Sequence, residues 1–122
     1  MFLRVINKTK IFGTAFAAVA ALGQADAAKS DAAGMAFFEK NIRPVLANNC
    51  YQCHSAEARN LKGELFLDSK QGMLSGGESG PVIVPGKPAE SRLLQAIRRD
   101  GKLKMPPRDK LSGRVANNFA KW

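Results

Sequence analysis

One five-residue segment contains both cysteines and the only histidine of the 122-residue chain: Cys50-Tyr51-Gln52-Cys53-His54. This C-x-x-C-H pattern is the attachment signature of a c-type haem. Each thiol adds across one vinyl group of the porphyrin, and the two-residue spacer sets the thiols at the separation of those vinyls. His54 then binds the iron from the proximal face. Because Cys and His are both rare, a chance match in a chain this short should occur about once in a thousand sequences.

Three other uses of a C-x-x-C pair fit this chain less well. A thioredoxin-like redox centre usually lies between a strand and a helix in a βαβ unit, which the sequence does not indicate. A structural zinc site needs four protein ligands, whereas Cys and His supply three here. A disulfide between Cys50 and Cys53 would close a very small, strained loop with little entropic gain. We therefore predict one haem c per chain, attached to Cys50 and Cys53, with His54 as an iron ligand.

The first 27 residues have the composition of a secretory signal peptide. An Ala-rich apolar region lies at 11–23, and Ala25-Asp26-Ala27 matches the small-x-small cleavage pattern. The basic region before it consists of Arg4, Lys8 and Lys10. Bacteria attach haem through thioethers outside the cytoplasm, so export agrees with the haem motif. We predict a signal peptide at 1–27 and a periplasmic or otherwise exported protein.

The apolar region at 11–23 is too short for a comfortable membrane span, and no second apolar run follows it. We expect no stable membrane insertion unless the signal stays uncleaved and acts as an anchor. Residues 28–122 then form one domain, of a size that buries only about two-thirds of its unfolded surface. A buried, covalently held macrocycle would supply the apolar surface that such a small core lacks.

Apolar residues recur at helical spacing between Gly34 and Asn48, which predicts an amphipathic helix. Pro44 predicts a kink near residues 40–43, or a helix in two pieces, because proline lacks an amide hydrogen and clashes with the preceding turn. The apolar positions are Phe37, Phe38, Ile42, Val45 and Leu46. We expect Phe37 and Phe38 to pack in the core.

Residues 57–86 are rich in Gly and Pro, and their apolar runs are too short for a sheet. We expect loops that fold over the haem, with one helical turn at 69–74. Pro88 predicts the start of another helix, which should end by Asp100-Gly101. Its buried residues should be Leu93, Leu94 and Ile97. The fold class is therefore all-α.

The last predicted helix begins after Ser112, whose side chain can act as the N-cap. Its apolar positions, spaced by four and three residues, are Val115, Phe119 and Trp122.

An electron-transfer haem needs a second iron ligand, and the chain has no second histidine. The soft thioether of methionine is the obvious candidate, because Met/His ligation is the cytochrome c arrangement and raises the potential. Met105 follows His54 by 51 residues. The next two residues, Pro106-Pro107, should hold the backbone there extended and stiff. We predict Met105 as the distal ligand.

The other three methionines are weaker candidates. Met1 would leave with the signal peptide, and Met35 lies near the start of the first predicted helix. Met73 follows His54 by only 19 residues, which is short for a loop that must reach the opposite haem face. We expect Met73 to fill a gap in the core instead.

Basic residues gather around the predicted ligand. The chain has a formal net charge of +9, of which about +7 remains without the four charged residues of the signal. A group that we call the basic cluster comprises Arg92, Arg98, Arg99, Lys102, Lys104, Arg108 and Lys110. Such a cluster would steer an acidic redox protein towards the haem edge, although a solvated face is the plainer interpretation. Nucleic-acid binding is not expected, because no recognition motif accompanies the charge.

In this order, the motifs resemble a class I cytochrome c and, more narrowly, a planctomycete-type cytochrome c domain. The resemblance rests on residues 38–46, the haem motif, 65–69, 80–88, 105–107 and 111–112. It implies a small cytochrome c fold of three to five helices, with long loops wrapped around one covalently bound haem. It implies that His54 and Met105 are the axial ligands. It also implies that the first and last helices cross, with Phe38 near Phe119 and Trp122.

The leading hypothesis is an exported mono-haem cytochrome that transfers single electrons and is not an enzyme. Its partners would be redox proteins with acidic docking faces, or the other subunits of a larger complex. The alternative is a haem enzyme or gas sensor with an open distal site, such as a peroxidase-like domain. That chemistry requires a distal His or Arg and a vacant iron position, whereas the only histidine is already used.

Overall fold

The computed structural model describes residues 19–122, with side chains from residue 29 onward. The described chain divides into two compact units, with the boundary between residues 32 and 33. The basic region of the predicted signal peptide, and most of its apolar region, lie outside the described residues. No helix within 19–122 is long and apolar enough to cross a membrane.

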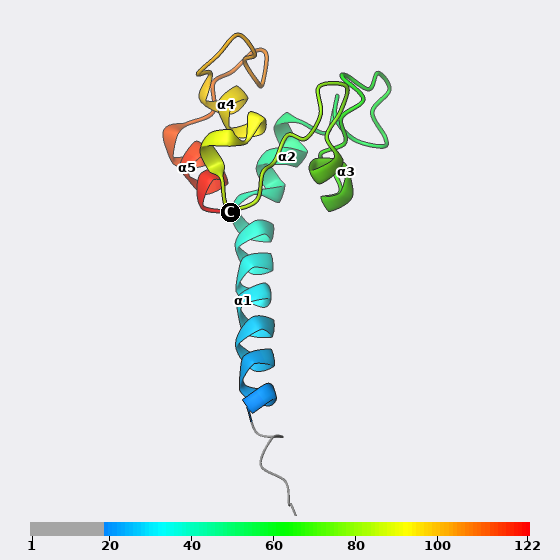
Figure 1. The fold of residues 1–122 in the computed structure, drawn as a ribbon. Helices are drawn as coiled ribbons and strands as arrows, with labels where there is room; N and C mark the ends of the chain where they lie inside the picture. The colour runs from blue at the N-terminus through cyan, green and yellow to red at the C-terminus, as the bar shows by residue number, and fades with distance from the viewer. Residues whose placement is uncertain (1–18) are drawn as a thin grey trace, which may run out of the picture. The chain divides into compact units, whose positions relative to one another are not determined.

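The described chain is helical and contains no strand; only an isolated bridge joins Gly77 and Gly80. The helices are α1 (Val19–Asn41), α2 (Arg43–Asn49), α3 (Lys70–Ser75), the 3-10 helix η1 (Pro88–Glu90), α4 (Arg92–Arg98) and α5 (Gly113–Lys121), as Figure 1 shows. The prediction of an all-α chain with long connecting loops is confirmed.

The first predicted helix is in two pieces, as Pro44 indicated. α1 ends at Asn41, Ile42 stands between the helices, and α2 carries its proline in the first turn. A missing amide hydrogen costs little there, because the first amides of a helix lack intrahelical acceptors. α1 begins at Val19, well before the predicted start at Gly34, because the intervening sequence is rich in alanine and helix propensity is highest for that residue.

The loop between the haem motif and α3 is fixed by backbone contacts. The amide of Glu78 donates to the carbonyl of Gly63 over 2.9 Å, and a Cβ on Gly77 would collide with the same carbonyl. Glycine at 77 therefore allows the two stretches of loop to touch. α3 confirms the predicted helical turn, and its N-cap Ser69 accepts a hydrogen bond from the amide of Gly72.

The helix predicted from Pro88 is two elements, which corrects the sequence-based expectation. Ser91 separates η1 from α4 in an extended conformation (φ −77°, ψ 111°). Its buried hydroxyl accepts from the amide of Val84 (3.0 Å) and lies 3.1 Å from the carbonyl of Lys87. These bonds to the preceding loop prevent a continuous helix. α4 ends at Arg98, close to the predicted end, and buries the predicted apolar residues.

α5 begins after Ser112, whose hydroxyl accepts from the amide of Val115, as predicted. The core combines α2, α3, α4, α5 and the loop before α3. Its larger buried side chains are Ile42, Leu46, Leu67, Met73, Leu93, Leu94, Ile97 and Phe119, with Phe37 and Phe38 packed against them. Phe38 and Trp122 have ring centroids 5.2 Å apart, and Trp122 meets Phe119 edge-on at 6.4 Å. The predicted aromatic contact between the first and last helices is confirmed.

Candidate haem-attachment site

The C-x-x-C-H motif forms one tight turn directly after α2. The carbonyl of Leu46 accepts from the amides of Cys50 (2.8 Å) and Tyr51 (3.0 Å), so the α2 ladder runs into the motif. The carbonyl of Cys50 in turn accepts from Cys53 (3.1 Å) and His54 (2.9 Å). These short-range bonds place both thiols and the imidazole on a single turn.

The two thiols are half-buried, and neither forms a disulfide. Burial raises the pKa of the Cys50 thiol from its usual 9.0 to about 11, so the thiol stays protonated at neutral pH. Two unpaired thiols at the C-x-x-C spacing are what thioether attachment requires.

The imidazole of His54 is free to bind iron. Its Nδ1 atom is buried without a hydrogen-bond partner, and no hydrogen bond in the described chain uses the other ring nitrogen, Nε2. Metal-bound histidines usually donate the N–H of the nitrogen that does not bind the metal to an orienting acceptor, and in the described chain no acceptor lies within hydrogen-bond distance of Nδ1. Together with the free thiols, this donor set fits haem c.

Residues beyond the motif hold this turn in place, and the sequence did not single them out for this role. The carboxylate of Asp68 accepts from the amide of Ala56 (2.8 Å), and the hydroxyl of Ser55 donates to the carbonyl of Tyr51 (2.7 Å). The pKa of the Tyr51 hydroxyl is raised, mainly because the side chain is partly buried and secondly because the Asp68 carboxylate lies near. The carbonyl of His54 accepts from the amide of Leu67 (2.8 Å). Only the fold brings residues 67 and 68 to the motif, so local patterns could not reveal this support.

Met105 lies on a loop anchored to the end of α4. Its amide donates to the carbonyl of Ala96 (3.0 Å), its side chain is half-buried, and the Met105–Pro106 peptide bond is cis. The guanidinium of Arg99 donates to the carbonyl of Pro106 (2.8 Å). The assignment of Met105 as an axial ligand stays a prediction.

The comparison with known families matches the same segment. The sequence profile of the family described as Planctomycete cytochrome C matches residues 50–109, a stretch that runs from Cys50 past Met105. The chain carries a planctomycete-type cytochrome c domain. No curated protein and no solved structure matches the chain. Cytochrome c domains bind haem c, generally serve as electron carriers and are typically exported.

The other described methionines of this cytochrome c domain differ sharply in exposure. Met73 is 5% exposed and belongs to the core, in line with its predicted role as a filler. Met35 is 61% exposed on α1. The buried position of Met73 is explained by packing alone.

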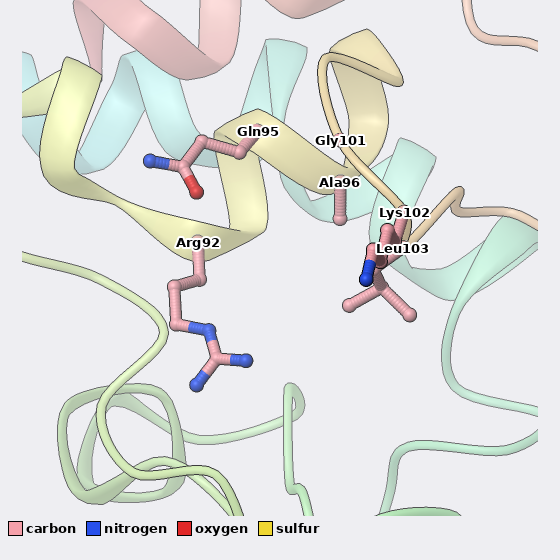
Figure 2. Close-up of a pocket in the computed structure, with 6 residues that line it drawn as sticks. All are labelled: Arg92, Gln95, Ala96, Gly101, Lys102 and Leu103. Carbon is pink, nitrogen blue, oxygen red and sulfur yellow. The ribbon is translucent and has the colours of Figure 1, made fainter.

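The basic cluster of the cytochrome c domain is mostly exposed, with Arg98 and Arg99 half-buried. In the described chain the ion pairs join Arg43 to Glu39 and Lys87 to Glu90, and neither includes a residue of the cluster. A cavity of about 240 Å³ lies between α4 and the loop that follows it, and Figure 2 draws the residues that line it. Its lining residues are Arg92, Gln95, Ala96, Gly101, Lys102 and Leu103.

Proposed function

We propose that this chain is an exported mono-haem c-type cytochrome that transfers single electrons. The carrying observation is the turn after α2, which presents two unpaired thiols and an imidazole together. Cys50 and Cys53 would hold the haem, and His54 and Met105 would ligate its iron. When bound, haem c supplies an iron centre that gains and loses one electron at a time.

The residues of the chain have distinct tasks in this proposal. The carbonyls of Leu46 and Cys50 hold the motif turn, so the thiols and the imidazole do not have to be gathered from separate loops. The thioether of Met105 is a soft ligand that favours the ferrous state and raises the potential. Because both ligands stay in place, electron transfer requires little rearrangement of the chain. The predicted signal peptide at 1–27 would deliver the chain to the compartment where haem is attached.

The first test of this function is covalent haem. The chain, co-expressed with a haem-attachment system, should keep its haem through acid extraction and show no free thiol after denaturation. A colourless polypeptide would contradict the proposal.

The second test separates a carrier from an enzyme or gas sensor. With Met105 on the iron, the ferrous protein should bind carbon monoxide only slowly, because no coordination position is open. Rapid binding by the wild-type protein, measured by stopped-flow absorbance, would favour the open-site alternative.

We further propose that the partner is a redox protein with an acidic docking face. The support is that Arg92 and Lys102, two exposed cations without a carboxylate partner in the described chain, line the cavity from opposite sides in Figure 2, with exposed Leu103 beside Lys102. Exposed charges of one sign attract an oppositely charged surface and accelerate association.

Small oxidants of opposite charge can test this surface without the natural partner. Oxidation of the ferrous protein by ferricyanide should slow as salt rises, whereas oxidation by a cationic cobalt complex should not, because exposed charges are screened within about 8 Å at physiological ionic strength. Replacing Lys102 and Lys104 by Glu should slow the ferricyanide reaction about fivefold at low salt. Lys70→Glu, an exposed control on α3, should change it far less. Equal effects of the two changes would reduce the cluster to an ordinary solvated surface.

A further inference from the structure

Arg99 occupies an unusual backbone position at the end of α4. It is the C-cap residue and has a left-handed conformation (φ 66°, ψ 34°). Glycine is the usual residue in this conformation at helix ends, because a side chain is strained there. Gly101 is only two residues away, yet the helix ends on an arginine. The arginine side chain must therefore contribute something that glycine could not.

The contacts of Arg99 converge on the segment that carries Met105. The guanidinium Nη2 donates to the carbonyl of Pro106 over 2.8 Å, in a half-buried setting. The carbonyl of Ala96 accepts from the amides of both Arg99 (3.2 Å) and Met105 (3.0 Å). In Figure 2, Ala96 lies beside Gly101, where the chain turns back over α4. One hydrogen bond therefore holds the backbone at Met105, and the Arg99 guanidinium holds the next residue.

The same guanidinium has a nitrogen atom, Nε, that is buried without a hydrogen-bond partner. An unpaired buried donor destabilises the folded state, and a residue needed only to end a helix would not introduce one. Moreover, the positive charge of Arg99 has no carboxylate partner in the described chain. The side chain of Arg99 therefore holds the Met105 loop rather than stabilising α4.

We propose that Arg99 is a positioning residue for Met105. Its planar guanidinium fixes the backbone on the carboxyl side of Met105, and this keeps the thioether where the iron can bind it. The inference rests on the proposed function, since it assigns Arg99 a role in holding the proposed ligand. It predicts that the loop opens more often, and releases the iron more often, when the guanidinium is absent.

The test compares the rate of carbon monoxide binding by the ferrous holoprotein in the wild-type protein, in Met105→Ala and in four further variants. Arg99→Gln removes the charge and the fork of donors, and Arg99→Lys keeps the charge with a single donor group. Arg98→Gln is the matched control, because Arg98 is also half-buried and its side chain forms no hydrogen bond or ion pair in the described chain. Ile97→Val lowers global stability within α4 and leaves the hydrogen bonds of Ala96 and Arg99 to the loop in place.

Arg99→Gln should bind carbon monoxide about tenfold faster than the wild-type protein, as expected for the loss of a hydrogen bond from a charged donor. The binding rate of Arg99→Lys should lie between those of Arg99→Gln and the wild-type protein. The rates of both controls should stay within about twofold of the wild-type rate. The sulfur-to-iron charge-transfer band of the ferric protein should weaken in the same order. Amide hydrogen exchange at Met105, measured without any added iron ligand, should accelerate in Arg99→Gln, less in Arg99→Lys, and in neither control.

Two outcomes separate this inference from the function on which it rests. If Met105→Ala binds carbon monoxide no faster than the wild-type protein, Met105 is not the ligand and the proposed ligation fails. If Met105→Ala binds rapidly but Arg99→Gln behaves like Arg98→Gln and Ile97→Val, the ligation stands and the positioning role of Arg99 is wrong.

Discussion

The turn that carries the thiols and the loop that carries Met105 are held by contacts of different range. Hydrogen bonds between residues three to five apart form the motif turn, which continues directly from α2. The Met105 loop has no helix of its own and is anchored to the end of α4 through Ala96 and Arg99. The turn that carries the thiols is therefore formed by local bonds, with distant support from Leu67 and Asp68, whereas the position of the Met105 loop depends on the packing of α4.

The largest effect is expected on the attachment side. Replacing both Cys50 and Cys53 by Ala should abolish covalent haem and leave the chain largely unfolded, because a domain of this size has a small core. Haem staining of the denatured protein and far-UV circular dichroism would measure the two effects. Ser55→Ala should retain its haem, since the hydroxyl only supports the turn. A folded, haem-free double variant would show that the core does not need the macrocycle.

On the ligand side, Met105→Ala should keep the haem but change its iron. The distal position should open, giving high-spin or water-ligated iron, and the potential should fall by on the order of 100 mV, within the roughly 0.8 V range that axial ligands set. Absorption spectra and redox titration would show these changes. An unaltered spectrum would show that Met105 does not ligate the iron.

Met73→Ala separates packing from ligation. Met73 is buried in the core, so its truncation should cost about 2–5 kcal/mol of unfolding free energy while the iron spectrum stays that of the wild-type protein. Chemical denaturation of the holoprotein would measure the loss. Met35 is exposed, so Met35→Ala should change the free energy of unfolding by no more than about 0.5 kcal/mol. A change of spin state in Met73→Ala would contradict the division between core and ligand methionines.

The smallest effect concerns the support of the motif turn. Asp68→Ala removes the carboxylate that accepts from the amide of Ala56, and should cost about 1 kcal/mol because the bond is exposed to solvent. Ligation by Met105 should be unaffected, as measured by the rate of carbon monoxide binding. A faster rate in this variant would show that the two sides are coupled more closely than their contacts indicate.

The sequence predicted the parts of the fold that depend on residue type or short spacing. Pro44 indicated the break between α1 and α2, and Ser112 indicated the start of α5. The interruption at Ser91 and the left-handed Arg99 were not predicted, because each depends on hydrogen bonds to a separate loop. The same limit applies to the site, where the motif identified its own chemical groups but not the supporting carboxylate of Asp68.

The carbonyl of Leu46 accepts from the amides of both Cys50 and Tyr51, so the haem motif is an extension of α2. This affects the order in which the chain folds and acquires its haem. Helical turns form within about a microsecond, whereas contacts between distant segments wait for the chain to collapse. A newly made chain can therefore present Cys50 and Cys53 side by side, transiently, before α4 and the Met105 loop have met. Haem attachment would then precede the closing of the distal side, and the bound macrocycle would become the template against which α4 and its loop assemble.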